Sequence, residues 1–299
     1  MHAIEVLSAF ADKIQQEPLS TEVSRHAKRA LIDWYAAAYP GASDPAVEIL
    51  RSLLLDEPAC DAADLVAGGQ ATARSAALVN GAAAHAAELD DSYRDAMYHP
   101  GAATIAAALA ACQEQGLCGV RLLKAIVTGY EVSTRIGVVL GRAHYQYWHS
   151  TGTVGTFGAA AAAGSAYGLN QAQFAHALGN AATFAAGLQQ AFRSDSMSKP
   201  LHAARAAEAG VLAAKAARRG LTGAWDMLDG KGGLGQAMSD GPSWDGVGDT
   251  LSKDFHITRL TFKNHVGCGH AFAAIDAALQ PALRGGACLA SWQRPLERL

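Results

Sequence analysis

Apolar residues recur every three or four positions along most of this chain, which is the spacing of an amphipathic α-helix. The first predicted helix carries apolar residues at this spacing from Ile4 to Ile14. Ser20 is a suitable N-cap for a second helix, which we expect to run to about residue 38 and to be stopped by the pair Pro40-Gly41. The other predicted helices cover about residues 45–55, 71–91, 102–114, 120–140, 151–167, 171–181, 200–219 and 270–279.

Four stretches lack the helical spacing. Residues 65–69 are predicted to be a short strand or a loop, and residues 229–249, dense in Gly, Asp and Ser, a loop. Residues 251–262 are expected to begin an extended segment, and residues 281–299 to be an unstructured end. Alternating strand patterns and regular repeats are not evident before residue 250, so the predicted fold class is mainly all-α.

Composition supports closely packed helices. The chain has 299 residues, of which 50% are hydrophobic and 66 are alanine. Alanine has the best helix propensity and lets backbones approach each other. This length suits one large domain or two of ordinary size. The formal net charge of −3 argues against a nucleic-acid partner, which would favour a basic excess.

Cysteine usage and hydropathy address the compartment. The five cysteines are odd in number and form no C-x-x-C pair, so we expect neither a disulfide framework nor a cysteine-rich zinc site. The N-terminus lacks a signal-peptide pattern. The most apolar stretch, residues 101–112, is too short to span a bilayer. We therefore expect a cytoplasmic protein without a membrane partner.

Four segments combine residue types that carry chemistry, and the first runs from Glu88 to His99. On a helix, Glu88 would share a face with Asp91 and with Ser92, because the spacings are three and four. His99 precedes Pro100, whose ring pushes the histidine backbone out of the helical region. A histidine held in a loop before a helix can point into a cleft. The structural alternative is a solvated acidic helix end followed by a loop histidine.

The second segment begins at His149 and continues with glycines at every third position. Ser150 or Thr151 is a natural N-cap, which places His149 beside a helix N-terminus. The field there favours an anion and lowers the pKa of a histidine, which favours a neutral base. No Gly-Lys-Ser/Thr follows, so the glycines do not form a P-loop. They serve either a function or tight helix packing.

The third segment contains Lys199, Pro200 and His202. Pro200 suits the first turn of a helix. Lys199 then lies at the helix end where the dipole disfavours a cation. The lysine either extends into water or is compensated by an anionic ligand, and His202 shares its face. Both interpretations remain open.

The fourth segment contains Lys263, Cys268 and His270. Cysteine and histidine are zinc ligands, but the other ligands of a structural zinc set are missing nearby. We therefore expect no metal here.

In this order, the four segments resemble the MmgE/PrpD superfamily, and the resemblance covers about residues 1–280. Each motif is weak alone, whereas the ordered combination is specific. The resemblance implies a helical domain, here residues 1–260, joined to an α/β lid domain with the site between them. Residues 261–299 would be the start of that lid followed by an atypical tail. Homodimers without a metal or organic cofactor are also implied.

The implied activity is that of a lyase or isomerase, similar to 2-methylcitrate dehydratase. Such an enzyme abstracts or donates a proton next to a carboxylate of a small di- or tricarboxylic acid. His99, His149 and Lys199 match the family's active-site positions. Either histidine is a candidate base, and Lys199 is a candidate anion clamp or acid. The sequence leaves dehydration, decarboxylation and epimerisation open.

A further set of polar residues is predicted to contact the polycarboxylate substrate. Two of them depart from the family pattern, because Glu88 stands where relatives often have Asp, and Cys268 where some have His. The predicted set is Glu88, Asp91, Ser92, His202, Lys263, Cys268 and His270.

The family's members are considerably longer, and the resemblance fades after Ala278. The residues beyond it do not look like a lid, so we expect a chain truncated or frameshifted relative to the family. The alternative function is therefore an inactive paralogue that keeps the helical dimer scaffold. A binding module of unrelated kind is a third interpretation.

Overall fold

The computed structural model describes residues 1–54 and 62–285, with the side chains of His270 and residues 280–285 outside the description. This part of the chain is mainly helical, which confirms the predicted fold class. In chain order its α-helices are α1 (Ala3–Gln16), α2 (Thr21–Gly41), α3 (Pro45–Leu53), α4 (Ala73–Ala86), α5 (Pro100–Glu114), α6 (Gly119–Tyr145), α7 (Ser150–Tyr167), α8 (Gln171–Phe184), α9 (Lys199–Arg218), α10 (Leu234–Met238) and α11 (Phe272–Gly285). Shorter elements are β1 (Ala63–Asp64), β2 (Gln70–Ala71), η2 (Arg94–Ala96), η3 (Gln189–Phe192), η4 (His256–Arg259) and η5 (Gly269–Ala271).

Capping residues explain where several helices begin. The Ser20 hydroxyl accepts the N–H of Val23 at 3.2 Å, so the predicted cap of α2 is confirmed. The helix α2 ends at Gly41, within the Pro40-Gly41 pair predicted to stop it, although it runs beyond the expected residue 38. Proline has a helical φ and here costs only the bond to the preceding turn, so the last turn includes Pro40. The N-cap of α7 is His149 itself, one position before the predicted Ser150.

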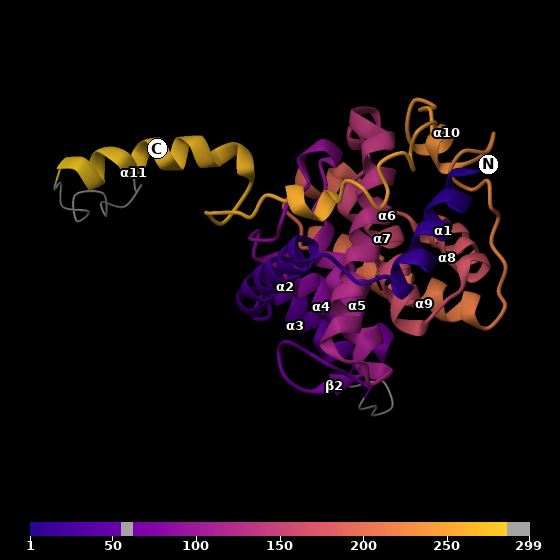
Figure 1. The fold of residues 1–299 in the computed structure, drawn as a ribbon. Helices are drawn as coiled ribbons and strands as arrows, with labels where there is room; N and C mark the ends of the chain where they lie inside the picture. Colours follow the sequence, from indigo (N-terminus) through magenta and orange to yellow (C-terminus); the bar gives the residue numbers. More distant parts are fainter. Residues whose placement is uncertain (55–61, 286–299) are drawn as a thin grey trace.

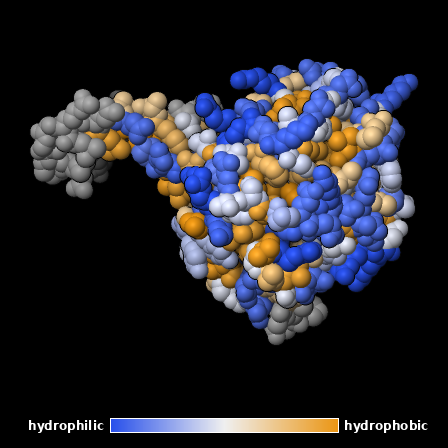
Figure 2. All heavy atoms as spheres, viewed as in Figure 1, coloured by the Kyte–Doolittle hydropathy of each residue, from blue (hydrophilic) through white to orange (hydrophobic). Residues whose placement is uncertain are grey.

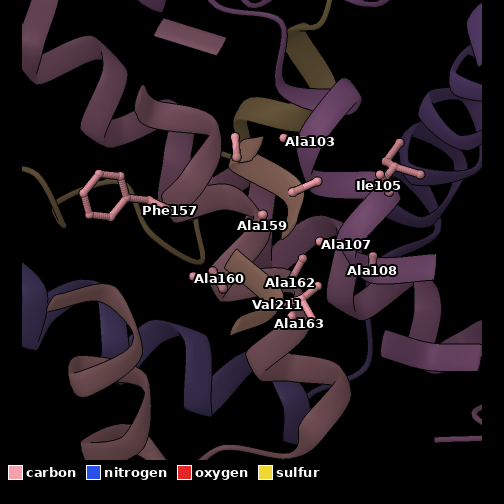
Figure 3. Close-up of a cluster of buried hydrophobic side chains, with 14 of the residues drawn as sticks. Ala103, Ile105, Ala107, Ala108, Phe157, Ala159, Ala160, Ala162, Ala163 and Val211 are labelled. Carbon is pink, nitrogen blue, oxygen red and sulfur yellow. The ribbon is translucent and has the colours of Figure 1, made fainter. Parts of the chain in front are cut away.

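The central helix of the body is α7, all of whose residues are buried (Figure 1). It contacts α5, α6, α8 and α9. Figure 3 shows that many of the buried side chains around it are alanines, which lie with the larger Phe157, Ile105 and Val211 in one cluster. Small side chains allow these helices to approach closely, which places the ends of α4, α5, α7 and α9 near one another.

Glycines provide the closest helix contacts. A Cβ on Gly158 of α7 would lie 2.5 Å from the hydroxyl oxygen of Thr104, and one on Gly210 of α9 would lie 2.5 Å from the backbone nitrogen of Ala160. Neither space accommodates a side chain. Gly158 of the regularly spaced glycines after His149 therefore serves tight helix packing.

The non-helical segments follow their predictions in part. Residues 65–69, predicted to be a strand or a loop, form the turn between β1 and β2, which pair antiparallel with Ala63 opposite Ala71. The predicted loop 229–249 is interrupted by the short helix α10. Residues 281–285 belong to α11 and not to the predicted unstructured end, and residues 286–299 lie outside the described part of the chain.

Residues 251–262 form turns and η4 instead of the predicted extended segment. The cause is a buried carboxylate on α6, since Glu131 accepts the N–H groups of His256 and Ile257, each at 3.0 Å. Arg135 donates to the carbonyl oxygen of Asp254 at 2.8 Å and pairs with Glu131. These tertiary bonds replace the ladder bonds that an extended segment would need.

The helix α11 projects away from the body (Figure 1). The part of the chain that joins α11 to the body carries apolar residues on its surface (Figure 2). Exposed large apolar side chains also occur on α2 and α3, namely Ile32, Tyr39, Ile49 and Leu53. Such surface is what the expected homodimer requires, and the homodimer stays a prediction. Within the described residues, no helix combines the length and apolar character of a membrane span.

Candidate active site

The first predicted motif lies in a loop, because α4 ends at Ala86 rather than near Asp91. Glu88 adopts a positive φ of 55°, a conformation in which a helix cannot continue. The expectation that Glu88, Asp91 and Ser92 share one helical face is therefore wrong. The loop instead points its side chains in different directions, toward Lys199, Tyr130 and His99.

Asp90 lies at the centre of the site, and it is not among the site residues predicted from the sequence. Its side chain is only 2% exposed. One oxygen, Oδ2, lies 2.6 Å from His85 Nδ1 and 3.9 Å from His99 Nδ1. The other, Oδ1, accepts from the Lys263 ammonium at 3.3 Å. Burial opposes the charge, but His85, His99 and Lys263 outweigh it and hold the Asp90 pKa far below its usual value.

His85 is the second residue that the sequence analysis missed. Its imidazole is fully buried, and its ring centre lies 5.6 Å from that of His99 and 5.3 Å from that of His149. The available signal was a lone histidine inside an alanine-rich helix. A buried polar ring at such a position requires a partner, and Asp90 supplies it.

His99 is oriented by the loop that precedes it. It is the N-cap residue of α5, and its Nδ1 lies 2.7 Å from the carbonyl oxygen of Asp91. Nδ1 therefore carries the proton and donates it to that carbonyl, which leaves the lone pair on Nε2. The Ser92 hydroxyl lies 3.2 Å from the same nitrogen. Burial lowers the His99 pKa, although the Asp90 carboxylate opposes this, and the side chain is 23% exposed.

Asp91 supports His99 from behind. Its carboxyl accepts the N–H of Gly101 at 2.9 Å and the hydroxyl proton of Tyr130 at 2.7 Å. These bonds fix the first turn of α5, whose N-cap is His99. Burial raises the Asp91 pKa to about 7. Because both oxygens are occupied inside the protein, the geometry gives Asp91 a supporting position rather than the predicted contact with substrate.

His149 and His202 form a hydrogen-bonded pair. Their Nδ1 atoms lie 2.9 Å apart, so one nitrogen donates and the other accepts. His149 is 2% exposed, and the edge of Phe192 meets its ring at a centroid distance of 4.5 Å. Burial lowers the His149 pKa well below its usual value and the His202 pKa to about 4. The pair is therefore neutral at physiological pH.

Lys199 occupies the first turn of α9, as predicted. Its ammonium donates to the carboxylate of Glu88 and lies 5.2 Å from the ring centre of Phe192. The compensating anion is therefore part of the chain itself. Beside this cluster opens a pocket of about 390 Å³. The residues that line it are Leu188, Gln190, Ala191, Ser194, Ser196, Ser198 and His202.

Lys263 reaches the cluster from the far end of the chain. A two-stranded bridge between Thr261 and Ser92 positions it, and its side chain is only 4% exposed. Its ammonium donates to the carbonyl oxygen of Glu88 at 3.0 Å as well as to Asp90. Lys263 is therefore more deeply buried than Lys199.

Cys268 and His270 complete the predicted set. Cys268 is exposed and is the N-cap residue of η5. His270 lies outside the described side chains. The structure therefore gathers the three predicted catalytic residues, His99, His149 and Lys199, and does not show Cys268 inside the cluster.

This helical body, with a buried cluster of histidines, lysines and carboxylates, has the groups that an acid–base enzyme uses. Residues 5–246 match the model of the MmgE/PrpD N-terminal domain. The chain therefore belongs to the MmgE/PrpD family, as the sequence resemblance indicated.

Several relatives are cis-aconitate decarboxylases or proteins similar to them. A cis-aconitate decarboxylase-like protein of Aspergillus oryzae is 28% identical over an alignment of 288 positions, which covers 91% of this chain and 60% of the relative. The cis-aconitate decarboxylase of Aspergillus terreus is 29% identical over 61% of this chain and 39% of its own length. The Homo sapiens protein of that name is 36% identical over 54% of this chain and 34% of its own length. The chain thus matches only part of each relative.

Proposed function

We propose that the cluster binds a small polycarboxylic acid and transfers a proton next to one of its carboxylates, as a lyase or isomerase does. The observation that carries this proposal is the meeting of His99, His149 and Lys199 from three helix starts. Neutral histidines and a cation are the groups that such a proton transfer requires. The family relationship to cis-aconitate decarboxylases supports the same chemistry.

Each group has a proposed role. His99 is the proton carrier, because its Nε2 lone pair is fixed by the bond from Nδ1 and its ring is partly exposed. Lys199 binds a substrate carboxylate and stabilises the enolate-like charge. His149, paired with His202, presents a neutral ring to the same space.

Decarboxylation is the first reaction to test, because of what the matched relatives are named. Loss of carbon dioxide leaves the electron pair of the broken carbon–carbon bond on the substrate. The Nε2 lone pair of His99 takes up a proton from solvent and passes it to this carbanion, which forms the new carbon–hydrogen bond. The product keeps its remaining carboxylates, and His99 returns to its neutral form. Elimination of water would instead use His99 as a base, which removes a proton from the carbon next to the carboxylate.

A second candidate is a non-catalytic scaffold. The observation that favours it is that both lysines of the cluster contact carboxylates of the chain itself, Lys199 with Glu88 and Lys263 with Asp90. A site that is neutralised internally does not depend on an anionic ligand for its stability.

The experiment is a turnover assay with cis-aconitate and 2-methylcitrate, followed by proton NMR and by carbon dioxide release. We expect turnover by the native chain, its loss in His99→Gln and its retention in His176→Gln. His176 is a matched control because it lies on α8, outside the cluster, where it bonds the carbonyl oxygen of Gly223. Absence of turnover by the native chain with every substrate would favour the scaffold.

A further inference from the structure

Glu88 has a backbone conformation that its side chain does not favour. It follows the C-cap of α4 with φ 55°, where glycine or asparagine is usual. A non-glycine residue in this region costs free energy and persists only where its surroundings enforce it. Here the Glu88 carbonyl oxygen accepts from the N–H of Gly267 at 3.1 Å and from the Lys263 ammonium at 3.0 Å. The conformation aims the side chain at the start of α9.

The Glu88 carboxylate is bound to the Lys199 ammonium, which is the cation that the proposed function assigns to a substrate carboxylate. Oε1 accepts from the Lys199 ammonium, and Oε2 lies 3.9 Å from that of Lys263. Burial would raise the Glu88 pKa, but Lys199 outweighs burial and holds the pKa below its usual value. The carboxylate is therefore charged at neutral pH. The side chains of Glu88 and Lys199 are 29% and 24% exposed, so a ligand can approach both.

We propose that Glu88 is an internal carboxylate that competes with the substrate for Lys199 and so sets how tightly polycarboxylates bind. This inference rests on the proposed function. A substrate carboxylate that reaches Lys199 must either displace Glu88 or approach it against charge repulsion. The ion pair between Glu88 and Lys199 is partly exposed. A substrate carboxylate can therefore displace Glu88 by a rotation of the Glu88 side chain, while the backbone stays fixed.

The charges around the cluster determine whether removal of the Glu88 charge strengthens or weakens the binding of a polyanion. The two lysines each lie against a carboxylate of the chain, Lys199 against Glu88 and Lys263 against Asp90, while His149 and His202 are neutral. Both cations that a polyanion would meet are thus already paired in the ligand-free state. Removal of the Glu88 charge makes the site one charge more positive, and the added attraction grows with the number of carboxylates on the ligand.

The experiment is calorimetric titration of Glu88→Gln, Glu88→Asp and the native chain with citrate and with succinate. Glu88→Gln removes the charge with little change of shape. Glu88→Asp keeps the charge but is one methylene shorter and withdraws from Lys199. The matched control is Glu114→Gln, because Glu114 pairs with Lys215 at 2.6 Å near the other end of α9 with similar exposure. Thermal melting checks that each variant is folded.

We expect Glu88→Gln to bind citrate roughly 10-fold tighter than the native chain, Glu88→Asp to lie between them, and Glu114→Gln to match the native chain. The gain for succinate should be smaller. If the native chain binds citrate and Glu88→Gln binds no more tightly, the competition is refuted while the proposed function stands. If no variant binds either acid, both the competition and the proposed function are refuted.

Discussion

Replacing Asp90 with asparagine removes one negative charge from the most buried part of the site while keeping the shape of the side chain. The Lys263 ammonium, 4% exposed and 3.3 Å from Asp90 Oδ1, then keeps its positive charge without its nearest anion. Its other anionic neighbour, Glu88 Oε2, lies 3.9 Å away. Asp90→Asn is therefore expected to leave an under-compensated buried cation.

The magnitude follows from the distance. Two unit charges 3.3 Å apart attract by about 5 kcal/mol at an effective dielectric constant of about 20. The asparagine amide recovers part of this through hydrogen bonds to His85 and Lys263. Removal of one partner from a buried ion pair typically costs about 3–5 kcal/mol, so we expect a loss of about 3 kcal/mol in the free energy of unfolding.

The effect has a defined pH dependence. The Asp90 pKa is lower in the folded than in the unfolded protein, so its stabilisation is present above the unfolded value of about 4 and is lost as pH falls below it. The difference between the native chain and Asp90→Asn should therefore be constant from pH 7 to pH 5 and shrink toward pH 3.

The assay is urea unfolding followed by far-ultraviolet circular dichroism. Asp254→Asn is the control, since Asp254 pairs with Arg259 at 2.8 Å and both side chains are nearly half exposed. An exposed pair contributes only about 0–1 kcal/mol. Equal unfolding midpoints for Asp90→Asn and Asp254→Asn would refute the central role given to the Asp90 charge.

Three further outcomes are expected. Lys199→Ala should weaken citrate binding by about 1.5–3 kcal/mol in calorimetry, since a charge-assisted hydrogen bond is lost, while loss of its partly exposed ion pair with Glu88 should change the urea midpoint less; an equal loss in both would show a structural role. Gly210→Ala should lower stability by about 1–3 kcal/mol in thermal unfolding, because the new Cβ meets the backbone of Ala160, and an unchanged melting temperature would contradict that contact. Because the pKa values of His149 and His202 are lower in the folded protein, the unfolded state gains protons first, so the native chain should lose more stability than His202→Asn as pH drops from about 6.5 toward 4, and equal changes in the two proteins would refute the neutral pair.

The sequence was most informative where local rules decide the structure. Pro200 marks the start of α9 and thereby places Lys199 at a helix terminus, and Pro100 places His99 before α5. Both placements follow from the chemistry of proline alone. Helix periodicity likewise found the body, because its pattern is long and regular.

The sequence was least informative where distant segments decide. The end of α4 depends on the left-handed Glu88, which Lys263 and Gly267 hold from the other end of the chain. The hydropathy pattern of the sequence does not indicate hydrogen bonds between such distant residues. The pairing of His85 with Asp90 was missed for the same reason, since the loop geometry that joins them exists only after α4 has ended.

The contact between Lys263 and Glu88 joins residues 175 positions apart in the sequence. Closing so long a loop costs chain entropy, and contacts of high sequence separation slow folding. The helices of the body are local structures and can form before it. Asp90 has its lysine only when residues 261–267 have reached the loop after α4. The charge arrangement of the site therefore depends on a segment that a shorter chain, cut before residue 261, would lack.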